Sequence, residues 1–324
     1  MSLLIKIALI GVSLLGLAGL SQHEDAPLKA QKPIVIPGGP GAFDWMLVDA
    51  KSDRVFATHK GTKSVAVVDL KTDKPLDSVE VGTAQGVAID RKDNKIFLGD
   101  EDEKKIVVLD YTTLKKTGEI AVTGPVDDIA YCPKNGMLYA DCDAGEEVWV
   151  IDVKTEKVVS TIKVPTAPEK LEYDKTSERI YQNIKSDNSV QVIDPATNKV
   201  EKTFKTEPMT GPHGLAIDGK AQRLFSAGSN GKLIVIDLKT GKIIATVDIE
   251  KGVDQIAYDK GNHRIYCAGK GNISVVESTE VGAKLLGNVP SPKGCHTIAV
   301  DGKTHAVWTC YYDDKESYLL KLTP

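Results

Sequence analysis

The stretch Gly86-Val-Ala-Ile-Asp90 is followed by Lys95-Ile-Phe-Leu98 and then by Ile106-Val-Val-Leu-Asp110. This succession of short apolar runs recurs along the chain, and the acidic residue that ends the first run marks each copy. The seven markers are spaced 41, 42, 42, 44, 41 and 42 residues apart: Asp49, Asp90, Cys132 in place of Asp, Asp174, Asp218, Asp259 and Asp301. A period of about 40 to 45 residues with several short runs per copy is typical of a β-propeller.

Strands rather than helices are expected in every copy, because apolar and polar residues alternate with period two and Val, Ile and aromatic residues are frequent. The second run of each copy contains one aromatic position: Phe56, Phe97, Tyr139, Tyr181, Phe225, Tyr266 and Trp308. The third run ends in Val-Ile-Asp at Asp152, Asp194 and Asp237. The sequence therefore predicts an all-β fold, a seven-bladed β-propeller with four-stranded blades.

The seventh copy ends at Pro324, directly after its third run, and so lacks an outer strand. Lys32-Pro-Ile-Val-Ile36 precedes the first copy and has the outer-strand pattern. We expect this segment to pair with residues 317–322 and to close the ring, which removes the exposed edges of an open sheet. Residues 33–324 are thus predicted to form a single propeller domain.

The N-terminal residues have the pattern of a secretory signal peptide. Lys6 precedes an apolar run from Ile7 to Leu20, and small and polar residues follow. We expect residues 1–20 to be the signal, cleavage at about residues 20–30, a disordered leader over residues 21–32, and a periplasmic or secreted protein. The run of 14 residues is short for a membrane span, so none is expected in the mature chain, although an uncleaved anchor is the alternative.

The composition and the absence of several motifs argue against some classes of partner and cofactor. The net charge of −4 lacks the basic footprint of proteins that follow a phosphate backbone, which argues against a nucleic-acid partner. The sequence contains no Gly-x-Ser-x-Gly elbow, phosphate-binding glycine loop, Cys-x-x-Cys-His or His-Glu-x-x-His motif. We therefore expect no nucleotide cofactor and no covalent haem.

The repeat resembles that of the YVTN-repeat seven-bladed propellers related to YncE, through strands that read x-Val-x-Val-Ile-Asp after an aromatic second strand. The resemblance covers residues 33–324. It implies the propeller fold, whereas the functions it implies range from surface-layer proteins to a proposed DNA binder and the propeller portions of redox enzymes. The Asn that usually ends the family's tetrad is replaced in every copy: His59, Asp100, Cys142, Ile184, Gly228, Gly269 and Tyr311.

A column of polar residues lies five positions before the markers, where each innermost strand begins. Its members are Asp44, Gln85, Asp127, Glu169, His213, Asp254 and His296. Two and four positions further along, the residues are apolar, as at Leu215 and Ile217. We expect the polar column to surround one mouth of the central channel.

Imidazole and carboxylate groups are common ligands of zinc, copper, nickel and iron. His213, Asp254 and His296 come from three consecutive blades, and Asp44 comes from the next one around the ring. The column could hold one divalent transition metal, an organic or peptide ligand without metal, or only water. His59, at the end of a second strand, is either a further metal ligand or an ordinary strand-end residue.

Three further residues stand out. Glu172 occupies a position that is Ala or Leu in the other copies, so it is either paired or lines the channel with a raised pKa. Phe43 and Trp45 follow a long glycine-rich approach to the first copy. They form an aromatic wall for a ligand, or they fill a gap beside the closing strand.

Five cysteines leave at least one unpaired. If a tight turn near residues 301–304 places Val300 opposite His305, then Cys295 lies opposite Cys310 and a cross-strand disulfide becomes possible. Cys132 and Cys142 fall at opposite ends of their hairpin and are not expected to pair.

Three functions fit these patterns. The first is an exported protein that binds a small ligand, a metal ion or a peptide at the mouth through Phe43, Trp45 and the polar column. The second is a metal-dependent lyase or hydrolase, in which His213 and His296 hold the ion and a carboxylate acts on the proton, with these candidates: Asp254, Glu169 and Glu172. The third is a protein-interaction scaffold.

Overall fold

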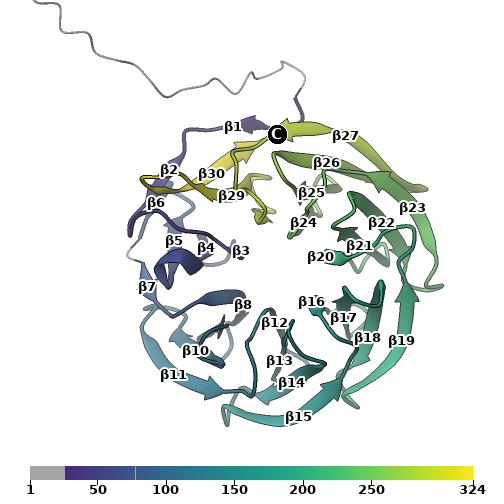
Figure 1. The fold of residues 1–324 in the computed structure, drawn as a ribbon, viewed down its shortest axis with the longest axis horizontal. Coiled ribbons are helices and arrows are strands. Elements are labelled where there is room, and N and C mark those ends of the chain that lie inside the picture. The colour runs from purple at the N-terminus through teal and green to yellow at the C-terminus, as the bar shows by residue number, and fades with distance from the viewer. Residues whose placement is uncertain (1–25, 77) are drawn as a thin grey trace, which may run out of the picture.

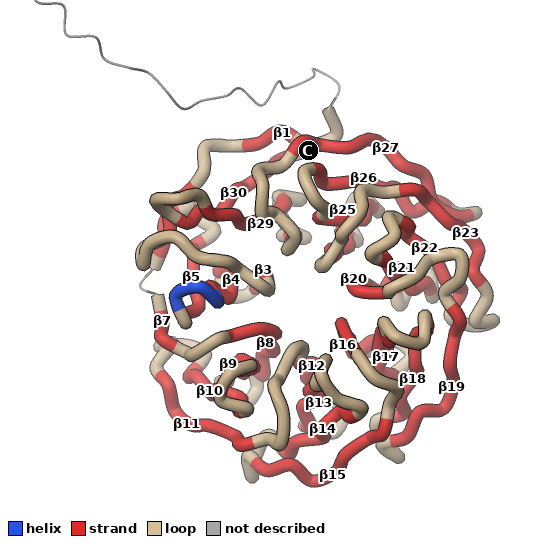
Figure 2. The backbone as a smooth tube through the Cα atoms, viewed as in Figure 1, coloured by secondary structure: helices blue, strands red, loops and turns tan. Residues whose placement is uncertain are grey.

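The computed structural model describes residues 26–76 and 78–324, and these form a closed ring of seven antiparallel sheets (Figure 1). The predicted signal peptide and residues 21–25 of the predicted leader lie outside the described residues. Each sheet is a blade, with its first strand nearest the axis and its last strand at the outer edge of the ring (Figure 2). The predicted all-β propeller with seven blades is confirmed.

The strands of the first four blades follow the repeat. Blade one contains β3 (Met46–Asp49), β4 (Arg54–His59), β5 (Ser64–Asp69) and an outer edge of β6 (Lys74–Pro75) and β7 (Val79–Glu80). Blade two contains β8 (Ala84–Asp90), β9 (Lys95–Asp100), β10 (Lys105–Asp110) and β11 (Lys116–Ala121). Blade three contains β12 (Ile129–Cys132), β13 (Met137–Asp141), β14 (Glu147–Asp152) and β15 (Lys157–Lys163). Blade four contains β16 (Pro168–Asp174), β17 (Arg179–Ile184), β18 (Ser189–Asp194) and β19 (Lys199–Lys205).

The remaining three blades complete the ring. Blade five contains β20 (Pro212–Asp218), β21 (Arg223–Gly228), β22 (Lys232–Asp237) and β23 (Ile243–Asp248). Blade six contains β24 (Ile256–Asp259), β25 (Arg264–Ala268), β26 (Asn272–Thr279) and β27 (Gly282–Pro290). Blade seven contains β28 (Ile298–Val300), β29 (Val307–Tyr312) and β30 (Ser317–Thr323), joined by β1 (Lys29–Ala30) and β2 (Ile34–Ile36). The short 3₁₀ helix η1 (Lys60–Thr62) follows β4.

The ring closes as predicted, because β2 pairs with β30 and places Ile36 opposite Ser317. The predicted boundary of the leader needs a correction: β1 also pairs with β30, with Lys29 opposite Thr323. Leu28, directly before β1, is buried in an apolar cluster with β26 and β30. This burial anchors a segment that its polar neighbours made look disordered, so the paired chain begins at residue 29 rather than 33.

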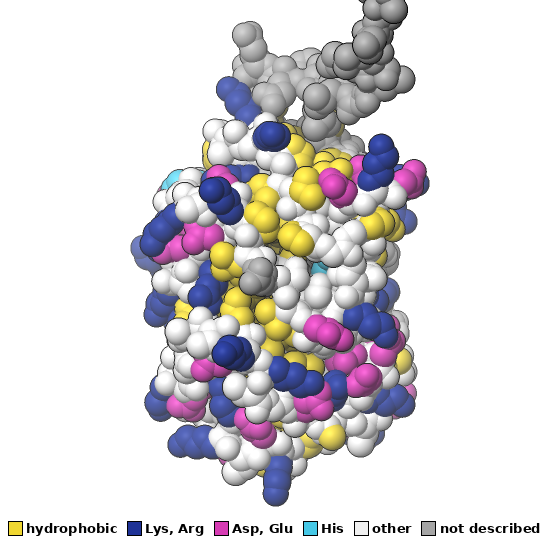
Figure 3. All heavy atoms as spheres, turned by 90° about the vertical axis from the view of Figure 1, so that its left-hand side faces the viewer, with side chains coloured by type: hydrophobic (Ala, Val, Ile, Leu, Met, Phe, Trp, Pro, Cys, Tyr) yellow, Lys and Arg dark blue, Asp and Glu magenta, His cyan; other side chains and the backbone are white. Residues whose placement is uncertain are grey.

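Apolar clusters lie between neighbouring blades and hold the ring together. The aromatic side chains of the second strands are all at most 3% exposed. Phe97 of blade two, for example, shares a cluster with Trp149 of blade three. Full burial of such a side chain contributes roughly 1.5–3 kcal/mol. On the outer side of the ring seen in Figure 3, where β2, β6 and β7 lie, apolar side chains gather between acidic and basic groups.

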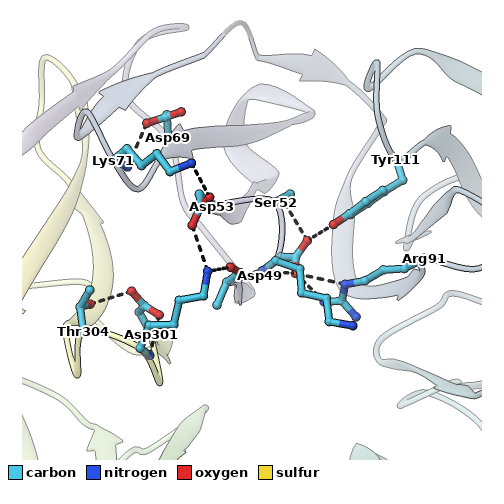
Figure 4. Close-up of polar contacts among 12 residues, drawn as sticks. Asp49, Ser52, Asp53, Asp69, Lys71, Arg91, Tyr111, Asp301 and Thr304 are labelled. Atoms are coloured by element: carbon cyan, nitrogen blue, oxygen red, sulfur yellow. Dashed lines mark hydrogen bonds and ion pairs between the residues drawn. The ribbon is translucent and has the colours of Figure 1, made fainter.

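The marker aspartates end the innermost strands because their carboxylates bind the turns that follow. Asp49 accepts hydrogen bonds from the Ser52 hydroxyl (2.6 Å) and the Lys51 amide (3.2 Å). Arg91 and Tyr111 of the next blade contact the same carboxylate (Figure 4). These hydrogen bonds lower the pKa of Asp49 to about 2, although its burial alone would raise it. The marker therefore fixes both the turn and the contact between blades.

The predicted register of the last hairpin is wrong by two residues. Val300 pairs with Val307, not with His305. The turn is longer than expected because Asp301 binds the Lys303 amide and the Thr304 hydroxyl.

All five cysteines are free and buried. No helix among the described residues is long and apolar enough to cross a membrane.

Candidate functional site at the channel mouth

The polar column gathers at one end of the channel, as predicted from the alignment of the copies. Six of its seven members line a cavity of about 200 Å³, here called the mouth, and His296 lines the cavity next to it. The lining residues are Asp44, Trp45, Lys60, Gln85, Glu101, Asp127, Asp128, Asp143, Glu169, Lys170, Lys185, His213 and Asp254. Seven of these are carboxylic acids and three are lysines, so the mouth is acidic.

One side of the mouth is a chain of imidazole and carboxylate groups from blades four to seven. Nε2 of His213 lies 2.9 Å from Oε2 of Glu169 and 3.2 Å from Oδ1 of Asp254. Oδ2 of Asp254 lies 2.7 Å from Nδ1 of His296, which joins the fourth polar residue to the network. Lys185 Nζ adds a 2.7 Å contact to Glu169.

Charge and burial have opposite effects on the pKa values in this network of imidazole and carboxylate groups. Burial favours the neutral form of His213, but the hydrogen bond and charge of Glu169 outweigh it and raise its pKa. The pKa of His296 is raised in the same way, against its burial, by Asp254. Burial alone would raise the pKa of Asp254, but the hydrogen bond from His296 and the charge of His213 lower it. The network therefore favours charged imidazolium groups next to carboxylates.

The other side of the mouth has more carboxyl groups than cations. Burial and the nearby charge of Asp254 raise the pKa of Asp44 to about 7, although Lys60 Nζ lies 3.6 Å away. Asp127 has a pKa raised well above its ordinary value by burial and by the charges of Asp141 and Asp44. Its side chain makes no hydrogen bond or ion pair with any described residue. These two acids are the groups that a bound cation could neutralise.

Sequence reasoning missed a second set of polar residues, which follows the second strands and lies four positions after the aromatic column. Lys60, Glu101, Asp143 and Lys185 line the mouth, and Ser229 and Lys270 line the cavity beside it. The same alignment of copies that revealed the polar column could have revealed this one. Lys60 Nζ, for example, lies 2.7 Å from Oε2 of Glu101 in the next blade.

The floor of the mouth separates it from the rest of the channel. Trp45 and Lys170 line both spaces, and Lys170 Nζ lies 4.5 Å above the centre of the Trp45 ring. The same ammonium lies 3.1 Å from Oδ2 of Asp128. Below it, a cavity of about 780 Å³ runs along the innermost strands and is lined by Glu172 among mostly apolar residues. Burial raises the pKa of Glu172 to about 7.

Phe43 and His59 lie at the ring closure and do not line the mouth. Phe43 is buried and stacks on His59 with ring centres 4.3 Å apart. Nε2 of His59 lies 2.9 Å from the Ser317 hydroxyl of the closing hairpin, and burial lowers the pKa of His59. Gly41 and Gly61 make this packing possible, because a Cβ on Gly61 would lie 2.5 Å from Cα of Gly41. Phe43 therefore fills the gap beside the closing strand, while Trp45 lines the mouth.

A second cavity of about 770 Å³ opens beside the mouth, between the loops of blades five to seven. It shares His213 and Asp254 with the mouth and adds His296. Val253 and Cys295 contribute apolar wall. The two cavities together offer a charged pocket with a less polar extension.

The geometry around the histidines bears on metal binding. Among the described residues, no group of three or more His, Cys, Asp or Glu side chains is arranged to hold a metal ion. Nε2 of His213 is already in contact with two carboxylates. Hydrogen bonding and proton transfer are the chemistry that this arrangement offers directly.

A seven-bladed propeller with a polar, acidic mouth is the class of protein that these observations define. The chain belongs to the family described as "Domain of unknown function (DUF5074)", whose model matches residues 92–273. Kuenenia stuttgartiensis hydrazine synthase contains a similar structure, with a TM-score of 0.74 and 16% identity, covering 88% of this chain and 95% of that chain. At this identity the likeness concerns the fold alone. Comparison with curated proteins found no match.

Proposed function

We propose that this protein is an exported binding protein that holds a small organic cation in its mouth. The ligand class is an amine or guanidinium group, either free or on the side chain of a peptide. The observation that carries the proposal is Asp127, a carboxyl group without an ion pair among the described residues, which lines the same cavity as Asp44 together with five further acids and three lysines. A bound cation would stabilise the ionised forms of both acids.

The cavity beside the mouth supports an extended ligand. A cationic group at Asp44 and Asp127 leaves room for a less polar portion beyond His213 and Asp254, in the space lined by Val253. The signal-like N-terminus supports the proposed export, and the resemblance to YVTN-repeat propellers supports a binding role outside the cytoplasm.

Three probes with the same five-carbon chain and different charge, at constant ionic strength, test this proposal: 1,5-diaminopentane, pentane-1,5-diol and glutarate. We expect only the diamine to raise the unfolding temperature of the protein, because a ligand of the folded state stabilises it by mass action. The Asp44→Asn/Asp127→Asn variant should lose this response. A matched variant, Asp93→Asn/Asp314→Asn, removes two exposed carboxyls outside the mouth and should keep it. An equal response to all three probes would contradict the proposal.

The alternative function is a metal-dependent lyase or hydrolase. Elemental analysis of protein purified without chelator or affinity-tag metal tests it. Near-stoichiometric metal in the parent that is absent from a folded His213→Ala/His296→Ala variant would favour that function over the binding of an organic cation.

A further inference from the structure

The channel has opposite charge at its two ends. The 780 Å³ cavity below Trp45 is lined by six cationic and three acidic side chains: Lys51, Arg91, Lys92, Lys170, Lys175 and Lys260 against Asp90, Glu172 and Asp174. The mouth has the reverse excess, with seven acids and three lysines. A ligand that suits one end is therefore repelled by the other.

Four of the six cations are free to bind a ligand. Arg91 is held by Asp49 and Lys170 by Asp128. The ammonium groups of the remaining four, here called the rim lysines, form no ion pair or hydrogen bond with the described residues: Lys51, Lys92, Lys175 and Lys260. They come from blades one, two, four and six, each within two residues of a marker aspartate, and all four are exposed.

Two of the three acids at this end, Asp90 and Asp174, are held by their own turns. Asp90 is buried and accepts the amides of Lys92 and Asp93 in its own turn. Asp174 accepts the amides of Thr176 and Ser177 in the same way. These carboxylates are directed into the turns, so they leave the rim lysines unpaired.

The wall between the rim lysines and the Trp45 floor is apolar. Apart from the strand that carries Glu172, each innermost strand contributes a small or aliphatic side chain at this position: Leu47, Ala88, Ala130, Ala216, Ala257 and Ala299. Tyr131, Tyr173 and Tyr258 add aromatic surface one position before their markers. An apolar ligand body can therefore replace water in this space.

We propose that this end of the channel binds an organic anion, a carboxylate or phosphate monoester that carries an apolar body. The rim lysines hold the anionic group, and the apolar body enters the channel toward Trp45. An anion without an apolar body has only exposed lysines to contact, and such contacts are weak.

Calorimetric titration of the full-length protein with octyl phosphate and with inorganic phosphate tests this site. We expect saturable binding of octyl phosphate and far weaker binding of phosphate. Replacing all four rim lysines by Gln should weaken octyl phosphate binding about tenfold or more, from the loss of several exposed charge contacts. A matched variant with four exposed, unpaired lysines elsewhere replaced by Gln should bind as the parent does: Lys115, Lys154, Lys157 and Lys199.

A second variant tests the apolar body. Ala216→Leu/Ala299→Leu copies the residue found at Leu47 and narrows the channel without changing its charge. We expect weaker octyl phosphate binding, and the unfolding temperature checks that the variant remains folded, since both alanines are buried. Equal binding by the parent and the rim variant, equal losses in the two lysine variants, or no effect of the two leucines would overturn the proposal. The Asp44→Asn/Asp127→Asn variant should retain this binding, which separates the result from that at the mouth.

Discussion

Nδ1 of His296 lies 2.7 Å from Oδ2 of Asp254. The other oxygen of this carboxylate lies 3.2 Å from Nε2 of His213 in the preceding blade, so one acid joins two imidazoles. Because their charged forms are stabilised together, the mouth should be sensitive to pH.

The unfolding temperature of the ligand-free protein should fall as the pH rises from about 5 to 8. The pKa values of His213 and His296 are raised in the folded state, so their stabilisation is complete below pH 6.5 and is lost as the pH rises through the folded pKa. Asp44 acts in the same direction, because its pKa of about 7 makes the folded state bind a proton that the unfolded state releases near pH 4. Differential scanning calorimetry measures this slope.

The control for this slope is Asp254→Asn, which removes the shared carboxylate. We expect the change in unfolding temperature between pH 5 and 8 to become smaller in this variant. An unfolding temperature that rises across this range in the parent would contradict the assignment of raised pKa values at the mouth.

Replacing Asp49 by Asn should destabilise the protein by roughly 2 kcal/mol at neutral pH. The pKa of Asp49 is lowered to about 2, so its contribution is present above pH 4 and is lost as the pH falls through 2. Urea unfolding at pH 7 and pH 3 measures the difference. Asp69→Asn is the matched control, since Asp69 binds its own turn in the same way but is only partly buried and makes no hydrogen bond to a neighbouring blade. Equal losses in both variants would mean that the contact between blades contributes nothing.

Glu172→Ala should stabilise the protein by roughly 1–3 kcal/mol at pH 8 and leave its stability unchanged near pH 4. Burial raises the pKa of Glu172 to about 7, so the folded state disfavours its ionised form above that pH. Ala is the residue at this position in five other blades, and the channel wall accommodates it. Chemical denaturation at the two pH values is the measurement. A loss of stability at pH 8 would instead point to an ion pair of Glu172 with a channel lysine.

Ile36→Ala should cost about 2–4 kcal/mol, because Ile36 is 1% exposed in the cluster that joins blades seven and one. Val35 lies next to it on β2 but is 45% exposed, so Val35→Ala should change the free energy of unfolding by less than about 0.5 kcal/mol. Similar effects of both changes would show that closure by β2 is not a principal source of stability.

The fold could be predicted because its determinants are local and repeated. The marker aspartates, the aromatic column and the outer-strand pattern before Ile36 each correspond to a structural element. The last hairpin was mispredicted because the hydrogen-bonded turn at Asp301 was expected to be two residues shorter than the turns after the other markers, whereas it matches them in length. The pairing of β1 was missed because the burial of Leu28 depends on blade six, far away in the sequence.

The mouth could be predicted only in part. Alignment of the copies located the polar column, since each member occupies the same place in its blade. It could not tell that Phe43 and His59 stack at the closure, because the long approach to blade one has no counterpart in the other copies. Nor could it tell which acids are paired. The distances between Asp254 and two histidines, and the unpaired state of Asp127, depend on how neighbouring blades are placed.

Titration calorimetry with 1,5-diaminopentane, in two buffers of different ionisation enthalpy at pH 7, tests the cation-binding mouth most directly. We predict one site per chain and a release of protons on binding, because a bound cation ionises carboxyls whose pKa values are raised in the free protein. Asp127→Asn should weaken the binding and reduce the proton release. Absence of binding, or binding without proton release that Asp127→Asn leaves unchanged, would contradict the account.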